Sequence, residues 1–406
     1  MTRLWPFLLS FVVAVPAAAA GFDLVPGDRV VLLGNTFIER DQGYGYLEAG
    51  LTLRHPGRPI LFRNLGWSGD TVFGEARASF DPPAVGYRRL KEHVLALKPT
   101  VIFVGYGAVE SFEGPAGLPR FREGLETLLE TLAETRARIL LLSPLRQEDL
   151  GRPLPDPAKH NEDLRLYRDE LQQVARQRGL PFVDLFDLPD APHSLTDDGL
   201  HLTAYGYWYL AIVIGRRLGL EPTPWSCNLD AHGANVPRRE MRGTRISNVG
   251  VQRGGLVFQA LDETLPFPSP PAGQRRHRHG EPGRVLRVDQ LPQGRYTLKI
   301  DGIVVQSGVT APELAKGLDL ERGPEFGQAE SLRAAIVKKN LLYFYRWRPQ
   351  NETYLFGFRK HEQGRNAAEI VQFDPLIAEQ EAAIVRLSVP VPHTYELLSE
   401  DGKVGR

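Results

Sequence analysis

The stretch DRVVLLGNTF, residues 28–37, decides the fold of this chain. Its apolar run ends at Gly34 and passes directly into the polar pair Asn35 and Thr36. A strand that is apolar on both faces is typical of a parallel sheet with helices on its two sides. Because ligands bind outside the carboxyl ends of such strands, the residues after Gly34 are the first candidates for a functional site.

The sequence up to residue 220 repeats this pattern. Apolar runs typical of strands occur at residues 28–34, 59–65, 100–106, 137–143 and 181–186. Apolar residues spaced by three and four, which is the helical period, occur at residues 44–54, 88–97, 118–135, 161–178 and 202–218. The alternation predicts an α/β fold with a five-stranded parallel sheet for residues 21–220.

The sequence changes character after a proline-rich boundary at residues 221–224, EPTP. Residues 221–323 predict a small β-rich region, with strands at 255–259, 285–288 and 296–300 and a turn at Asp301-Gly302. Residues 324–406 predict a mainly helical region, with helices at 325–345 and 376–388. The 406 residues suffice for more than one domain and for a large core.

A loop in the β-rich region carries a run of basic residues. Residues 266–283 are rich in proline and glycine and contain the run from Arg275 to His279. A loop of this composition does not fix its side chains, so we interpret it as mobile and solvated. A patch that binds phosphate or a polyanion is the alternative.

The first 20 residues have the features of a secretory signal. Arg3 precedes an apolar run at residues 7–15, and Ala18 and Ala20 fit cleavage before Gly21. The run is shorter than the roughly 20 apolar residues that span a bilayer, which disfavours the alternative of a membrane anchor. We therefore expect an exported protein, periplasmic or secreted, without stable membrane insertion after cleavage.

Charge and cysteine content exclude some partners and bonds. The 49 basic and 49 acidic residues cancel, so no long-range field favours binding of nucleic acid. With Cys227 as the single cysteine, no intrachain disulfide can form, and we expect a small buried side chain there. The residues His160, His193, His361 and Glu362 match no metal-site spacing, so we predict neither a metal nor a cofactor.

Polar segments that follow three of the strands and one late turn provide the groups that ester hydrolysis needs. They are Asn35-Thr36, residues 66–71 (GWSGDT), residues 106–111 (YGAVES) and residues 196–202 (TDDGLHL). Histidine ionises near neutral pH, so His201 can accept the proton of an attacking hydroxyl. Asp198, three residues earlier, can bind the other ring nitrogen. Backbone N–H groups at a helix start can stabilise an oxyanion.

The order of these segments resembles the SGNH, or GDSL, hydrolase family over roughly residues 28–218. The resemblance implies a flavodoxin-like three-layer sandwich and an esterase or lipase-like activity. A closer likeness is to exported bacterial SGNH-like proteins whose C-terminal extension carries a run such as RWRPQN, here residues 346–351.

The family's site residues fall on five positions of this chain. The nucleophilic serine falls on Thr36, the oxyanion glycine on Gly69, the oxyanion asparagine on Val109, and the aspartate and histidine on Asp198 and His201. Thr36 and Gly69 would then supply the backbone N–H donors of the oxyanion hole.

Two of these positions depart from the family's pattern. Thr36 keeps a hydroxyl, but its methyl group restricts χ1 and crowds the approach of a carbonyl. Val109 cannot donate a hydrogen bond, and loss of one oxyanion donor typically costs about 10²–10³ in rate. Taken singly, Thr36 and Asp198 could also be helix caps, and His201 could be an ordinary partly buried histidine.

Two functions from different classes follow. The first is an exported ester hydrolase that removes acyl groups, such as acetyl, from a small molecule, a polysaccharide or a cell-envelope glycan by attack of Thr36. The second is a catalytically impaired member of the family that binds a glycan or a protein. The C-terminal region would serve as a lid or a partner surface.

Overall fold

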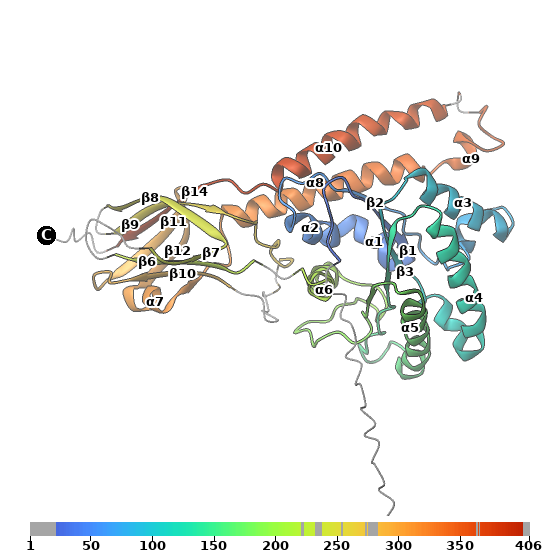
Figure 1. The fold of residues 1–406 in the computed structure, drawn as a ribbon, viewed down its shortest axis with the longest axis horizontal. Helices are drawn as coiled ribbons and strands as arrows, with labels where there is room; N and C mark the ends of the chain where they lie inside the picture. The colour runs from blue at the N-terminus through green and yellow to red at the C-terminus, as the bar shows by residue number, and fades with distance from the viewer. Residues whose placement is uncertain are drawn as a thin grey trace, which may run out of the picture.

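The computed structural model describes residues 22–220, 223–231, 238–252, 255–272, 274, 283–362, 364 and 366–400. Figure 1 shows an α/β body joined by long helices to a smaller β-sandwich. Three predicted features lie wholly or partly outside the described residues: the signal at residues 1–20, residues 221 and 222 of the proline-rich boundary, and the basic run from Arg275 to His279. No helix of the described ranges is both long and apolar enough to cross a membrane.

A five-stranded parallel sheet forms the centre of the α/β body, which confirms the predicted fold class. Its order is β2-β1-β3-β4-β5. The strands are β1 (Arg29–Gly34), β2 (Leu61–Asn64), β3 (Val101–Gly105), β4 (Arg138–Leu142) and β5 (Phe182–Val183). All pairs are parallel. The pairing of β1 with β3 runs from Val30 opposite Val101 to Gly34 opposite Gly105, so the carboxyl ends of the two strands lie side by side.

Helices cover both faces of this sheet, so alternate residues of each strand enter two different cores. Val30 and Leu32 of β1 face the core that α2 (Tyr46–Leu53) and α6 (Ala204–Arg217) complete. Val31 and Leu33 face the core of α3 (Pro83–Ala96), α4 (Gly114–Ala133) and α5 (Ala158–Arg178). This explains why the strands are apolar at nearly every position.

The segment after β1 is where the helix prediction was incomplete. The sequence predicted one helix at residues 44–54, whereas the structure has α1 (Thr36–Tyr44) followed by α2. Gly45 separates them with φ 66°, a left-handed conformation that costs glycine little and ends α1. Apolar periodicity is weak in α1 because only Ile38 and Asp41 are buried there.

The β-rich region is a sandwich of two sheets around its own core. One sheet has the order β13-β10-β6-β7 and the other β12-β11-β14-β9-β8. The strands are β6 (Trp225–Asp230), β7 (Arg238–Arg242), β8 (Thr244–Gln252), β9 (Gly255–Asp262), β10 (Arg284–Asp289), β11 (Arg295–Ile300), β12 (Ile303–Thr310) and β13 (Leu318–Asp319), with α7 (Ala311–Lys316). The turn at Asp301-Gly302 joins β11 to β12, and both residues have positive φ, as a tight hairpin requires.

The C-terminal region runs back along the α/β body and then returns to the sandwich. Helices α8 (Pro324–Trp347) and α10 (Phe373–Leu387) pack against each other and against the body, with the short α9 (Glu352–Leu355) at their far end (Figure 1). The final strand β14 (His393–Ser399) lies between β9 and β11. Strand β14 therefore completes a sheet that begins with β8, about 150 residues earlier in sequence.

A buried ion pair fixes α8 to the α/β body. Lys339 Nζ lies 2.7 Å from both carboxylate oxygens of Glu48 and also donates to the Phe62 carbonyl at 3.1 Å. The Lys339 and Glu48 side chains are only 1% and 4% exposed. Because both charges are paired and hydrogen-bonded, their burial is tolerated, and α8 is held in one position on α2.

Candidate active site

The end of β1 places Thr36 at the first position of α1. Asn35 caps the helix, because its side-chain oxygen accepts the Phe37 N–H at 3.3 Å. Gly34 permits the close approach of the neighbouring strand, since a Cβ there would lie 2.4 Å from the Gly105 carbonyl oxygen. The Thr36 hydroxyl thus lies at a helix N-terminus, where the dipole favours negative charge.

The loop after β2 brings Gly69 to Thr36. The Gly69 N–H donates to Thr36 Oγ1 at 3.2 Å, and Gly69 has φ 72°, which suits glycine. Beneath the loop Asp70 accepts from Arg77 Nε at 2.7 Å and from the Tyr106 hydroxyl at 3.0 Å. Burial raises the pKa of Asp70 in spite of the adjacent guanidinium. This buried network fixes the loop that presents the Gly69 N–H.

The late turn holds Asp198 against His201. The His201 Nδ1–H donates to Asp198 Oδ2 at 2.6 Å, and the Leu200 and His201 backbone N–H groups donate to Asp198 Oδ1 at 2.9 and 2.8 Å. Partial burial opposes ionisation of Asp198, but these hydrogen bonds outweigh it and lower its pKa to about 2. Asp198 is therefore ionised at neutral pH, and Nε2 of His201 remains free to accept a proton.

Thr36, Val109 and His201 line one cavity of about 580 Å³ at the carboxyl ends of the strands. Among the described residues, Thr36 Oγ1 and the His201 ring share no direct hydrogen bond, and the hydroxyl is held by Gly69 instead. Catalytic contacts of this kind are often long without substrate. The structure thus brings Thr36, Gly69, Asp198 and His201 into one region, and their catalytic roles stay predictions.

Val109 follows β3 and presents an isopropyl group to the cavity. The adjacent Glu110 is buried, and its two carboxylate oxygens accept the Val72 N–H at 2.9 Å and the Gly107 N–H at 2.8 Å. Burial raises the pKa of Glu110 to about 7 in spite of these bonds. Glu110 therefore connects the loops after β2 and β3, while Val109 leaves an apolar surface where the family pattern has a donor.

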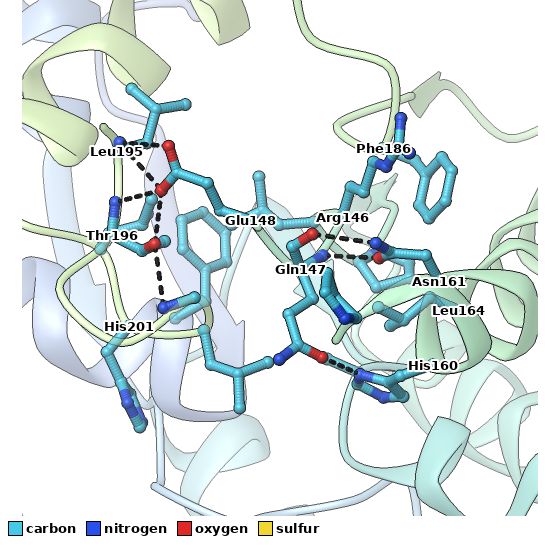
Figure 2. Close-up of a pocket in the computed structure, with 18 of the residues that line it drawn as sticks. Arg146, Gln147, Glu148, His160, Asn161, Leu164, Phe186, Leu195, Thr196 and His201 are labelled. Atoms are coloured by element: carbon cyan, nitrogen blue, oxygen red, sulfur yellow. Dashed lines mark hydrogen bonds between the residues drawn. The ribbon is translucent and has the colours of Figure 1, made fainter. Parts of the chain in front are cut away.

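Sequence reasoning missed the opposite wall of the cavity. Figure 2 shows Gln147, in the connection from β4 to α5, against His160 and Asn161. His160 Nδ1 lies 2.7 Å from Gln147 Oε1, and its Nε2 lies 2.9 Å from the hydroxyl of Ser111. Burial lowers the pKa of His160, which keeps the ring neutral. His160 is 49 residues from Ser111 and 13 residues from Gln147 in sequence, so no local pattern could have grouped these side chains.

The end of α8 supports the loop that carries Gly69. The Arg348 guanidinium lies 3.5 Å from the centroid of the Trp67 ring and 2.8 Å from Glu39 Oε1. The other oxygen of Glu39 accepts the Ser68 N–H. The RWRPQN run therefore stabilises the candidate oxyanion loop from outside the cavity. Among the described residues, Arg348 forms no hydrogen bond to a residue that lines the cavity.

One group of side chains has the composition of a metal site. Donor atoms of Asp197, Asp198 and His201 lie within 4.8 Å of one another, with both carboxylates well exposed. Asp198 Oδ2 is already bonded to the His201 Nδ1–H, and Asp197 forms a 3.9 Å ion pair with Arg40. The arrangement fits an imidazole oriented by its carboxylate better than a cation held by both.

Comparisons with known proteins bear on the family and on the fold of this chain. Residues 33–209 match the GDSL-like lipase/acylhydrolase family. The fold is similar to that of a diltiazem-metabolizing enzyme of a gut microbe, with a TM-score of 0.70 and 17% identity over 93% of this chain and 98% of that one. An acetylxylan esterase from Geobacillus stearothermophilus aligns with 49% of this chain and 98% of its own, at a TM-score of 0.40 and 20% identity. No curated protein matches the sequence significantly.

Proposed function

We propose that this chain cleaves a carboxylic ester by attack of Thr36, because residues 33–209 match the GDSL-like lipase/acylhydrolase family. The observation that supports this most is the shared cavity. The Thr36 hydroxyl, at a helix N-terminus, lines it together with His201, whose other ring nitrogen is held by the ionised Asp198. Acyl transfer requires a hydroxyl as the nucleophile and a base beside it, here an imidazole oriented by a carboxylate.

The proposed reaction has two acyl-transfer steps. His201 Nε2 takes the proton of Thr36 Oγ1 as that oxygen bonds to the carbonyl carbon, and the Thr36 and Gly69 N–H groups stabilise the oxyanion. Collapse breaks the bond to the alcohol oxygen, which leaves with the proton from His201. Water then attacks the Thr36 ester, His201 accepts its proton and returns one to Thr36, and the carboxylic acid is released.

We propose a small acyl group, such as acetyl, on a carbohydrate or another cell-envelope alcohol. The methyl of Thr36 and the isopropyl of Val109 narrow the space beside the attacked carbonyl, which favours a small acyl group. At the rim of the cavity Phe112 is 66% exposed and stacks on His160, with ring centroids 4.1 Å apart. An exposed ring of this kind offers a face on which a sugar can stack.

Export is part of the proposal and has its own test. The signal-like residues 1–20 support transfer out of the cytoplasm. Fractionation of cells that express the full chain should place it outside the cytoplasm with Gly21 as its new N-terminus. An uncleaved protein in the cytoplasmic fraction would contradict this part.

The activity is tested by release of p-nitrophenol from p-nitrophenyl acetate and of acetate from an acetylated xylooligosaccharide. His201→Ala should reduce kcat/KM to near the buffer rate, and Thr36→Val, which keeps the shape but removes the hydroxyl, should do the same. Thr36→Ser should retain or raise activity. Equal rates in the wild type and both null variants would show that the cavity does not hydrolyse esters.

Val109 supports a second candidate, a binding module without turnover. It leaves the oxyanion site with backbone donors alone, and one missing donor is worth about 10²–10³ in rate. Calorimetric titration with an acetylated oligosaccharide separates the two: binding without hydrolysis, unaffected by His201→Ala, would favour the module.

A further inference from the structure

Gln147 and Glu148, in the connection from β4 to α5, lie in the cavity wall between α5 and the turn that carries Asp198 and His201 (Figure 2). Figure 2 shows Glu148 pointing toward Leu195 and Thr196, whereas its neighbour Gln147 lies against α5. Glu148 belongs to none of the sequence segments with candidate chemistry, and the mechanism above does not use it. Its surroundings nevertheless account for the position of the His201 turn.

The Glu148 carboxylate accepts hydrogen bonds from the start of that turn. Its Oε2 accepts the Thr196 N–H at 2.8 Å and the Thr196 hydroxyl at 2.5 Å, and the Leu195 N–H lies 3.1 Å from each oxygen. Bonds to an ionised acceptor are stronger than those between neutral groups. The carboxylate thereby holds the backbone just ahead of Asp198.

The bonds continue to the far end of the turn. The Glu148 N–H donates to the Gly199 carbonyl at 2.9 Å, and the Gly199 N–H donates to the Thr196 hydroxyl oxygen at 3.1 Å. A bond from the Asp197 N–H to the His201 carbonyl at 3.0 Å closes the turn. Glu148 thus contacts the turn on both sides of Asp198.

The segment itself is anchored to α5, so it can resist movement of the turn. The Gln147 N–H donates to Asn161 Oδ1 at 2.8 Å, and Asn161 Nδ2 donates to the Gln147 carbonyl at 2.9 Å. The Asn161 side chain is buried in the first turn of a 21-residue helix. Rigid support of this kind is what a catalytic constellation needs.

We propose that Glu148 is a positioning residue, which sets the His201–Asp198 pair at the distance and angle needed to accept the proton of Thr36. This inference rests on the proposed function of the same cavity. Glu148 acts through Thr196 and Gly199 and touches no reacting atom. A displacement of about 1 Å in a catalytic group can cost about 10²-fold in rate, so loss of this anchor should lower kcat more than it raises KM.

The test uses Glu148→Gln in the full chain, with Asp149→Asn as the matched control. Both variants remove one negative charge from the same cavity wall. Within the described ranges, however, the Asp149 side chain accepts a single hydrogen bond, from the Gly151 N–H at 2.9 Å, and asparagine can keep it. We expect Glu148→Gln to lower kcat for p-nitrophenyl acetate by roughly 10–100-fold with a KM within about twofold. Asp149→Asn should stay within about twofold in both.

A second variant guards against a folding defect. Thr196→Val replaces the hydroxyl that joins Glu148 to Gly199 with a methyl group, and its folded fraction should show a smaller loss of kcat in the same direction. If Glu148→Gln loses no more activity than Asp149→Asn, or if its loss disappears once the unfolded fraction is subtracted, the positioning role is wrong.

A spectroscopic measurement separates this inference from the proposed function. The proton between His201 Nδ1 and Asp198 Oδ2 should give a downfield NMR signal that His201→Ala removes. Glu148→Gln should weaken or shift that signal, whether or not the wild type hydrolyses the ester. An unchanged signal in Glu148→Gln would overturn the positioning role. A shifted signal in Glu148→Gln, together with a wild type that hydrolyses no ester, would overturn only the esterase proposal.

Discussion

Val109→Asn should increase ester hydrolysis, because it adds a donor where the cavity now has an isopropyl group. Val109 lies in the loop that follows β3 and lines the same cavity as Thr36. Asparagine has nearly the volume of valine, so the half-buried position can accept it with little rearrangement. Its amide N–H would join the Thr36 and Gly69 N–H groups around the developing oxyanion.

The magnitude follows from the value of one donor. Removal of a single oxyanion donor costs about 2.7–4 kcal/mol, or roughly 10²–10³ in rate, so addition of a well-aligned one should approach that gain in kcat/KM. Thr36→Ser, which removes the methyl beside the attacked carbonyl, should add to it. Because the two changes affect different atoms of one transition state, the double variant should exceed either single variant.

The assay compares kcat/KM for p-nitrophenyl acetate in the wild type, Val109→Asn and the matched control Val109→Asp. Aspartate has the size of asparagine but is ionised and cannot donate, so it should give no gain. If Val109→Asn folds as well as the wild type and its rate stays within about twofold, the oxyanion position has been assigned to the wrong residue. A gain that survives His201→Ala would contradict the proposed role of the imidazole.

Three further variants test the support of the site. Lys339→Met leaves Glu48 buried without its partner and should lower the free energy of unfolding by about 3–5 kcal/mol in urea titration, whereas a loss below about 1 kcal/mol would contradict the buried pairing. Arg348→Met removes the contact with Trp67 and should lower kcat/KM about tenfold with little change in Tm; wild-type kinetics would show that the loop needs no such support. Burial raises the pKa of Glu110 to about 7, so the folded state keeps a proton that the unfolded state loses near pH 4.5. The free energy of unfolding should therefore fall by up to about 3 kcal/mol as the pH rises from 4.5 to 7, and Glu110→Gln should remove this part of the pH dependence; an unchanged slope would contradict it.

The sequence predicted the α/β body because its strands are buried on both faces. Val30 to Leu33 enter two helix-covered cores in alternation, and this leaves an uninterrupted apolar run that is easily recognised. The break between α1 and α2 was missed because a single left-handed residue, Gly45, makes it. The position of β14 was missed as well, since its partners β9 and β11 are set by tertiary pairing and by no local signal.

The candidate site was predictable in its local parts. Asp198 and His201 lie three residues apart in one turn, so their contact follows from spacing, and Thr36 follows from its place after β1. The supports of the site depend on distant residues. Glu148 meets Thr196 across 48 positions and Arg348 meets Glu39 across 309, and neither pair has a sequence pattern that could join them.

The central claim is that Thr36 is a nucleophile activated by His201. A fluorophosphonate ester tests it most directly, because it forms a stable bond with an activated hydroxyl and cannot be released by the second step. Peptide mapping after labelling should find the phosphonyl group on Thr36, and the label should be absent in Thr36→Val and strongly reduced in His201→Ala. A label on Ser111, or equal labelling of Thr36 with and without the His201 imidazole, would contradict the account.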